Sequence, residues 1–165
     1  MTRAVLSIGS NLGDRLAHLR TALEAVRPWL VAVSAVVETP PWGPVEQPDY
    51  LNAVLVVDDP EADADAWLAR AHAAEQRAGR TRDVRWGPRT LDVDVVSVSA
   101  DGVEVVRDDP DLTLPHPRAA ERGFVLVPWA DADPGATLRG ERVVALLAGV
   151  DRAGIRARPD LVLAP

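Results

Sequence analysis

Cysteine and lysine are both absent from the 165 residues. Without cysteine, the chain can form neither a disulfide nor a thiolate nucleophile, and nothing requires an oxidising compartment. Without lysine, a Walker-type phosphate loop is excluded, because that motif needs a Gly-Lys-Ser/Thr sequence. The 18 basic side chains are therefore all arginines, which favour forked hydrogen bonds to carboxylates and phosphates.

Long apolar runs are also missing. No stretch approaches the roughly 18 apolar residues of a membrane span, and the N-terminal MTRAVLSIGSN is too short an apolar run for a signal peptide. We therefore expect a cytoplasmic protein without a membrane partner. The net charge of -7 argues against a nucleic-acid partner, since nucleic-acid binding relies on a basic surface. A length of 165 residues with 47% hydrophobic residues suits a single domain over 1–165, expected to be a monomer.

Apolar runs and helical periodicity alternate along the chain. Strand-like runs occupy residues 4–8, 30–38, 53–57 and 91–99. A first helix, capped by Ser10 or Asn11, is expected to end near Pro28. A second helix, capped by Asp63 or Asp65, precedes the fourth strand.

This β-α-β-β-α-β order predicts an α+β fold with a ferredoxin-like βαββαβ core, in which helices pack on an antiparallel sheet. Asp101-Gly102 between apolar runs predicts a hairpin that returns over residues 103–106. Short helices are expected over residues 124–130 and 141–148. The last residues, 151–165, show no pattern that indicates a role.

The most informative stretch runs from Arg80 to Val95 and reads RTRDVRWGPRTLDVDV. Asp92 and Asp94 alternate with apolar residues, so on a strand their carboxylates share one face, roughly 6.6 Å apart. Such a pair suits one hydrated divalent cation or a close pair of cations, and Mg²⁺ prefers few carboxylates with water and phosphate as its other ligands. Four arginines precede the pair: Arg80, Arg82, Arg85 and Arg89. The residues alone favour a metal-bound polyphosphate site over the alternative, a solvated edge strand beside an arginine-rich loop.

Three segments carry a family resemblance: TPPWGPVEQPDYLN, RWGPRTLDVDV and LTLPHPRAAERGF. Together they resemble the 6-hydroxymethyl-7,8-dihydropterin pyrophosphokinases, the ATP-dependent kinases of folate biosynthesis, from the first strand to about Pro134. The resemblance implies transfer of a pyrophosphoryl group from ATP to the hydroxymethyl oxygen of the dihydropterin. The expected products are AMP and the pterin diphosphate, with attack at the β-phosphorus.

The resemblance also implies a role for individual residues. Asp92 and Asp94 match the family's metal ligands and should hold two Mg²⁺ ions, and Arg80 and Arg89 should assist transfer. Positions that match ATP contacts are Glu75, Arg82, Arg85, Trp86, Arg89, Thr113, His116 and Arg122. Positions that match the pterin pocket are Thr39, Pro40, Pro41, Trp42, Tyr50, Asn52, Trp86 and Phe124.

Several of these residues have simpler explanations when taken alone. Glu75 would be an ordinary helix-surface residue, although it lies near a helix C-terminus where its charge opposes the dipole. Phe124 would be a core residue of the following helix. His116, held between two prolines, suits a donor to phosphate better than a metal ligand, since three scattered histidines without cysteine have no zinc-ligand spacing.

Two positions and the length of one loop depart from the family pattern. Trp42 stands where a smaller apolar residue is common, and Asp111 lies near a position that is an ATP-contacting arginine in some members. The loop between Arg82 and Arg85 is one residue shorter. These departures concern nucleotide affinity and loop motion rather than the reaction.

Other functions compete with this interpretation. A non-catalytic small-ligand-binding module would keep an apolar pocket but has no use for paired aspartates beside an arginine loop. A Mg-dependent nucleotide hydrolase would use the same site, and only its indifference to an acceptor distinguishes it. An RNA-recognition domain shares the element order but stacks bases on several sheet aromatics, and this chain has one tyrosine and one phenylalanine.

Overall fold

The computed structural model describes residues 2–41, 43–80 and 90–164. The longest elements are the strands β1 (Thr2–Ser10), β4 (Tyr50–Asp59) and β5 (Asp92–Ala100) and the helices α1 (Arg15–Val26), α2 (Ala64–Arg77) and α3 (Gly123–Ala132). The shorter strands are β2 (Leu30–Val33), β3 (Val37–Thr39), β6 (Val103–Glu104), β7 (Arg107–Asp108), β8 (Thr113–Leu114), β9 (Thr137–Leu138), β10 (Glu141–Arg142) and β11 (Arg156–Ala157). The shorter helices are η1 (Arg27–Trp29), η2 (Ala119–Glu121), α4 (Val143–Leu146) and η3 (Leu147–Gly149).

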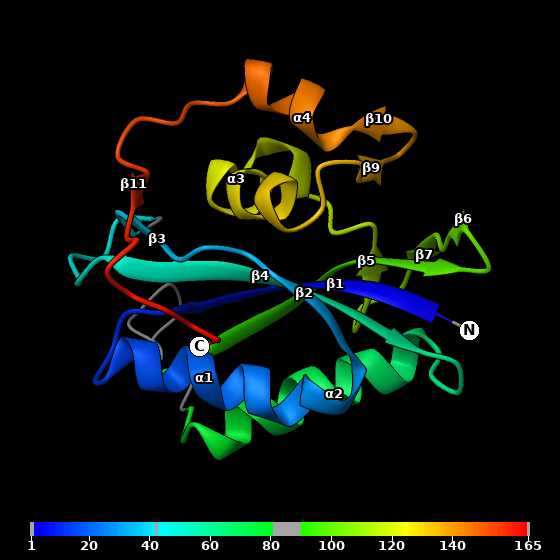
Figure 1. Cartoon of the computed structure of the whole chain (residues 1–165), viewed down its shortest axis with the longest axis horizontal. Coiled ribbons are helices and arrows are strands. Elements are labelled where there is room, and N and C mark those ends of the chain that lie inside the picture. The colour runs from blue at the N-terminus through cyan, green and yellow to red at the C-terminus, as the bar shows by residue number, and fades with distance from the viewer. Residues whose placement is uncertain (1, 42, 81–89, 165) are drawn as a thin grey trace.

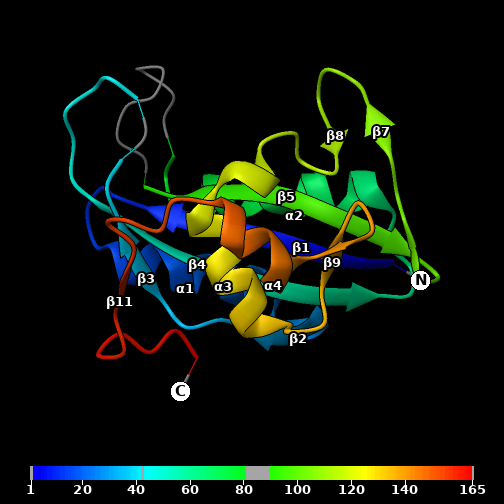
Figure 2. The same ribbon diagram turned by 90° about the horizontal axis from the view of Figure 1, so that it is seen from above.

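An antiparallel sheet forms the middle layer. Its strand order is β11-β3-β4-β1-β5-β6, and β2 also pairs with β4. Helices α1 and α2 cover one face of the sheet, while α3 and α4 cover the other (Figure 1). Seen from above, α3 lies across the strands and the β7–β8 hairpin extends beyond the sheet (Figure 2). The structure is thus a mixed helix and antiparallel-sheet fold.

Each face of the sheet has its own apolar core, because successive strand residues point to opposite faces. Leu6 and Ile8 of β1 pack with Trp67 of α2 in the core beneath α1 and α2. Val54 of β4 joins Trp129 of α3 in the core on the opposite face. Strand β1, which lies between β4 and β5, therefore contributes to both cores, through Leu6 and Ile8 on one face and Val5 on the other.

The ends of the helices show where local sequence cues succeed. The expected cap of the first helix, Ser10 or Asn11, is wrong: Asp14 caps α1, accepting a hydrogen bond from the Ala17 amide at 3.1 Å. Asn11 instead donates to the Pro48 carbonyl at 2.9 Å and so holds the segment before β4. Asp63 caps α2 as the sequence predicts. The first difference arises because Asn11 is used in a contact distant in sequence.

The strand expected over 30–38 is interrupted. Its two pieces, β2 and β3, both pair with β4. Between them, the Ser34 hydroxyl accepts the Val54 amide at 2.8 Å, and the Ala35 amide donates to Asp131 at 2.7 Å. The Ser34 amide still donates to the Val54 carbonyl at 3.0 Å, but the amides of Val54 and Ala35 bond to side chains, which interrupts the regular ladder at this point.

Two further differences lie in the C-terminal third. The helix expected over 141–148 begins only at Val143, because Glu141 and Arg142 pair with β9. The segment 151–165, for which the sequence predicts nothing, contains the edge strand β11.

The predicted turn at Asp101-Gly102 joins β5 to β6, with φ values of 50° and 82° at the two residues. Within the described residues, no helix is long and apolar enough to cross a membrane.

Candidate active site

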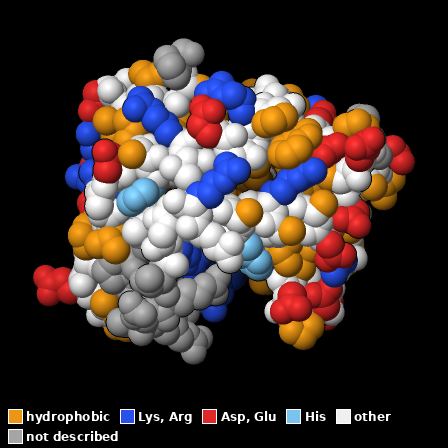
Figure 3. Space-filling model, turned by 90° about the horizontal axis from the view of Figure 1, so that it is seen from below, with side chains coloured by type: hydrophobic (Ala, Val, Ile, Leu, Met, Phe, Trp, Pro, Cys, Tyr) orange, Lys and Arg blue, Asp and Glu red, His pale blue; other side chains and the backbone are white. Residues whose placement is uncertain are grey.

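Two adjoining cavities lie at the end of the sheet where β5 begins. The first has a volume of about 230 Å³ and is lined by Ser7, Gly9, Thr39, Pro40, Tyr50, Asn52, Asp92, Asp94, His116, Arg122 and Phe124. The second has a volume of about 420 Å³ and is lined by Leu68, His72, Glu75, Arg80, Asp92, Val93, Asp94, Val95, Pro110, Asp111, Leu112, Thr113, His116 and Pro117. Asp92, Asp94 and His116 line both cavities. In the view from below, a notch opens at one edge of the molecule with arginine side chains inside it (Figure 3).

The strand register sets the floor of the first cavity. Gly9 of β1 lies between Asn52 of β4 and Asp92 of β5. A Cβ atom at Gly9 would come within 2.8 Å of the Asn52 side-chain oxygen, so the glycine permits this close approach. In the next row of the sheet, the small Ser7 lies beside Asp94. Small residues on the central strand therefore leave room between the amide and the two carboxylates.

The alternation predicted around the aspartates is present in the structure. Val93 and Val95 are buried in the core beneath α1 and α2, while Asp92 and Asp94 are partly exposed and line the cavities. The strand therefore turns both carboxylates toward the two cavities, as its period of two requires.

One wall of the first cavity is built from β3 and β4. The Asn52 amide nitrogen donates to the Thr39 hydroxyl at 2.7 Å, and both residues are buried. This hydrogen bond fixes which edge of the amide faces the cavity. Pro40 and Tyr50 complete this wall.

The opposite wall is formed at the start of α3. The guanidinium of Arg122 lies 5.4 Å from the centre of the Phe124 ring, and its Nη1 lies 3.8 Å from the Asp94 carboxylate. Arg122 thus places a positive charge beside the carboxylate pair, and the aromatic rings of Phe124 and Tyr50 both line the cavity.

A chain of ion pairs joins α2 to β5. The Arg80 guanidinium donates to Asp92 at 2.9 Å and also pairs with Glu75. The same Glu75 oxygen accepts the Val93 amide at 3.0 Å. The side chains of Arg80 and Glu75 are each only 7% exposed, so these contacts operate with little screening by water. Arg80 therefore neutralises part of the negative charge of the carboxylate pair.

His116 is oriented by its own backbone surroundings. Its amide donates to the Val96 carbonyl at 2.8 Å, and its Nδ1 accepts the Arg118 amide at 3.2 Å. Burial lowers the pKa of His116 to about 4; the positive charges of Arg122 and Arg118 add to this effect, and Asp92 opposes it. The ring is therefore neutral at pH 7. Because Nδ1 accepts a hydrogen bond, the proton is on Nε2, which can donate to a ligand.

Titration of the His116 ring by NMR should give a pKa near 4, well below the ordinary 6.5. The unfolded chain takes up this proton near pH 6.5 and the folded chain only near pH 4. The free energy of unfolding should therefore fall as the pH is lowered between these values. Replacement of Arg122 by glutamine should raise the pKa, because a nearby positive charge is removed. A ring that titrates near 6.5 would contradict this picture.

The structure brings most predicted site residues together. Thr39, Pro40, Tyr50, Asn52 and Phe124 line the first cavity, while Glu75, Arg80, Thr113 and His116 line the second. Arg122, predicted among the ATP contacts, lines the first cavity rather than the second. Pro41 is described but does not line either cavity. The positions of Trp42, Arg82, Arg85, Trp86 and Arg89 lie outside the described residues.

Sequence reasoning missed several lining residues. Ser7 and Gly9 of β1 reach the site only through strand register. Leu68 and His72 were recognisable from the sequence. His72 and Glu75 follow Leu68 by four and seven residues, so the three side chains lie on one face of the helix.

Asp92 and Asp94 supply the oxygen donors that a hard cation needs at this site. Among the described residues, no group of three or more histidine, aspartate or glutamate side chains forms a metal cage. Two neighbouring carboxylates suit Mg²⁺, which binds to one or two carboxylates and keeps its other positions for water and phosphate. Arg80, which lines the second cavity, also has a buried Nε atom without a hydrogen-bond partner among the described residues.

A carboxylate pair that suits Mg²⁺, with arginines beside it, supplies the positioning and charge neutralisation that enzymes of the phosphoryl-transfer class use. The family model described as 7,8-dihydro-6-hydroxymethylpterin-pyrophosphokinase (HPPK) matches residues 5–134. This chain belongs to that family.

Relatives agree with this assignment, and solved structures agree with the fold. Proteins named 2-amino-4-hydroxy-6-hydroxymethyldihydropteridine pyrophosphokinase are 48% identical in Mycobacterium tuberculosis, covering 99% of this chain and 94% of the relative, and 52% identical in Mycobacterium leprae, covering 94% and 88%. An HPPK-DHPS crystal structure in complex with substrates superposes with a TM-score of 0.66 at 13% identity. Wild-type HPPK-DHPS of Plasmodium falciparum gives a TM-score of 0.63 at 15% identity. The matches cover 90% of this chain but only 45% and 44% of the two solved chains, and at this identity they establish the fold alone.

Proposed function

We propose that the chain transfers the pyrophosphoryl group of ATP to the hydroxymethyl group of 6-hydroxymethyl-7,8-dihydropterin in folate biosynthesis, giving AMP and the pterin diphosphate. Membership of the family supports the reaction and the use of ATP as co-substrate. The observation that carries the site assignment is the pair of cavities that meet at Asp92, Asp94 and His116. This arrangement favours two substrates held side by side over a binding module with one ligand.

The first cavity is the proposed pterin site. The flat ring would lie between the aromatic faces of Tyr50 and Phe124, where stacking and burial both favour it. Asn52, held by Thr39, would hydrogen-bond to the polar edge of the ring. Pro40 closes the apolar side. Roles for Pro41, Trp42 and Trp86 rest on the family resemblance.

The second cavity is the proposed ATP site. Thr113 and Glu75 line it, and His116 can donate from Nε2 to a phosphate oxygen. Arg82, Arg85, Trp86 and Arg89 are assigned to the nucleotide by the family resemblance. We place Arg122 beside the transferred group rather than beside the nucleoside, because it contacts Asp94.

Asp92 and Asp94 would hold two Mg²⁺ ions. Bound there, the ions would neutralise the polyphosphate charge. The Arg80 guanidinium donates a hydrogen bond to Asp92 and is therefore available at the proposed site of transfer. Arg89 is the second arginine proposed to assist. Their contribution is positioning and charge stabilisation, which is what phosphoryl transfer requires of a protein.

We also propose that residues 1–165 form a single domain, because both cores pack on the same sheet. The strand order β3-β4-β1-β5 with α1 and α2 on one face supports a ferredoxin-like βαββαβ core whose second strand is divided into β2 and β3. The protein is proposed to be a cytoplasmic monomer that binds neither membranes nor nucleic acid.

Nucleotide product analysis tests the reaction. Purified protein with ATP and Mg²⁺ should form AMP only when 6-hydroxymethyl-7,8-dihydropterin is present. Equal AMP or ADP formation without the pterin would identify a nucleotide hydrolase instead. No turnover, combined with tight pterin binding, would favour a non-catalytic binding module.

A further inference from the structure

We propose that residues 151–160, here called the C-terminal clasp, join the two walls of the first cavity from outside and thereby position the residues that bind the pterin. The clasp lies beyond residues 5–134, the part matched by the family model. The inference rests on the proposed function, because it assumes that the first cavity holds the pterin.

The clasp contributes a strand to the sheet. In β11, Arg156 pairs with Glu38 and Ala157 with Val37 of β3, and the Arg158 amide donates to the Val36 carbonyl at 2.9 Å. On its other edge β3 pairs with β4. The strand that ends in the pocket residue Thr39 is thus held on both edges, and without the clasp it would be an edge strand.

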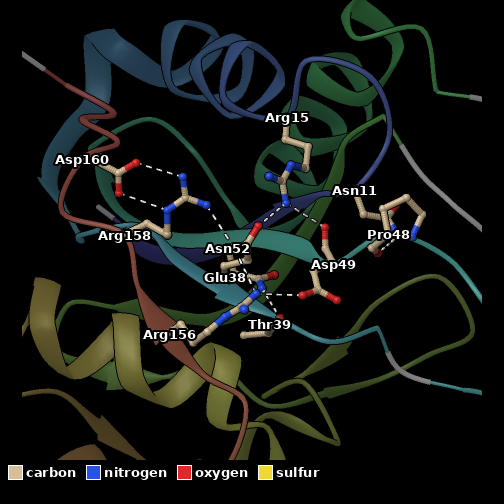
Figure 4. A network of polar contacts seen from close by, with 10 residues as sticks. All are labelled: Asn11, Arg15, Glu38, Thr39, Pro48, Asp49, Asn52, Arg156, Arg158 and Asp160. Carbon is tan, nitrogen blue, oxygen red and sulfur yellow. Dashed lines mark hydrogen bonds and ion pairs between the residues drawn. The ribbon is translucent and has the colours of Figure 1, made fainter.

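An ion cluster reinforces this pairing (Figure 4). The Glu38 carboxylate accepts hydrogen bonds from Arg15 at 2.5 Å, from Arg156 at 3.0 Å and from Arg158 at 3.0 Å. Its side chain is only 13% exposed. Burial would raise the pKa of Glu38, but Arg15 and Arg158 outweigh it and hold the pKa below its ordinary value. The carboxylate therefore stays charged and binds three arginines from two segments.

Two of these arginines also contact Asp49, the last residue before β4. Arg15 donates to the Asp49 carbonyl at 3.0 Å, and Arg156 donates to the Asp49 carboxylate at 2.8 Å. Glu38 and Asp49 immediately precede Thr39 and Tyr50, which line the first cavity. The cluster therefore joins both ends of the loop that separates two pterin-contacting positions.

The clasp also touches both walls by packing. A Cβ atom at Gly154 would lie 3.1 Å from the ring of Pro40, on the first wall. A Cβ atom at Gly123, the residue before Phe124, would lie 2.7 Å from the Ile155 Cδ1 atom. Figure 2 shows this segment passing from α4 beside the start of α3 to β3. One short segment therefore spans the distance between the two sides of the proposed stacking gap.

The contacts of the clasp lie on the side of the first cavity. Pro40 itself, and the residues that follow Glu38, Asp49 and Gly123, line the first cavity and are absent from the lining of the second. A loosened clasp should therefore widen or distort the pterin gap while leaving the nucleotide side intact. Ring stacking depends on the separation of the two aromatic faces, so small displacements should weaken binding.

Two variants test the clasp by separate means. The double variant Arg156→Gln/Arg158→Gln removes the ion pairs, and Ile155→Ala removes the packing on Gly123 without changing charge. The matched control is Arg152→Gln, since Arg152 is exposed and its side chain makes no hydrogen bond or ion pair with the described residues. Calorimetry would measure the dissociation constants of 6-hydroxymethyl-7,8-dihydropterin and of Mg²⁺ with α,β-methylene-ATP, and thermal unfolding would be recorded for each protein.

Both test variants should bind the pterin about tenfold more weakly, with affinity for the nucleotide analogue within about twofold of wild type. The control should match wild type for both ligands. Unchanged pterin affinity in both variants would overturn the proposed role of the clasp. An equal loss of affinity for both ligands, together with a lower unfolding temperature, would overturn it as well. Failure of the wild-type protein itself to bind the pterin would instead overturn the proposed function and the clasp with it.

Discussion

Replacement of Asp94 by asparagine should lower turnover by at least about a thousandfold, equivalent to about 4 kcal/mol of transition-state stabilisation. The substitution keeps the shape of the side chain but removes one of the two negative charges shared by the cavities. It also removes the carboxylate that lies 3.8 Å from Arg122. Rapid-quench measurement of AMP formation at saturating substrates would give the turnover.

The matched control for this variant is Asp108→Asn, which makes the same change of charge at an exposed position of β7. The control should retain wild-type turnover. Isothermal titration with Mn²⁺ and α,β-methylene-ATP should show weaker metal binding in the Asp94 variant only. Wild-type turnover in that variant would refute the assignment of Asp94 as a metal ligand.

Replacement of Arg80 by methionine should reduce both stability and turnover. Arg80 and Glu75 form a buried pair, and removal of one partner from such a pair costs about 3 kcal/mol or more, because the other charge remains buried. Urea unfolding monitored by tryptophan fluorescence would measure the loss of stability. Turnover should fall as well, because the methionine side chain cannot replace the contact of Arg80 with Asp92.

A double-mutant cycle separates these two roles of Arg80. Glu75→Gln combined with Arg80→Met should recover part of the lost stability, because the buried carboxylate is neutralised, but it should recover no turnover. Arg77→Met is the matched control, since Arg77 is exposed at the end of the same helix and its side chain makes no hydrogen bond or ion pair with the described residues. Recovery of turnover in the double variant would mean that Arg80 acts through the fold alone.

Local features of the candidate site were predictable from the sequence. The alternation of Asp92 and Asp94 with Val93 and Val95 depends only on the two-residue period of a strand, and it is present in β5. The cap at Asp63 and the turn at Asp101-Gly102 likewise depend on neighbouring residues. Such features require no knowledge of the remaining chain.

Features that depend on distant partners were not predictable. Asn11 does not cap α1 because it bonds to Pro48, and the strand over 30–38 is broken where Ser34 bonds to Val54. Arg122 lines the first cavity because of the position at which α3 crosses the sheet. In each case a contact across the fold outweighs a local preference of comparable or smaller energy.

By itself, the sequence determined the composition limits, the arginine-rich segment, the face shared by Asp92 and Asp94, and the family, because each is expressed in residue identity and short spacing. The tertiary structure alone decided that two cavities meet at those carboxylates, that Arg80 links Glu75 to Asp92, and that the C-terminal clasp lies beside Pro40. These arrangements depend on strand register and on helix packing, which bring together residues far apart in the chain and are set by the packing of the whole molecule.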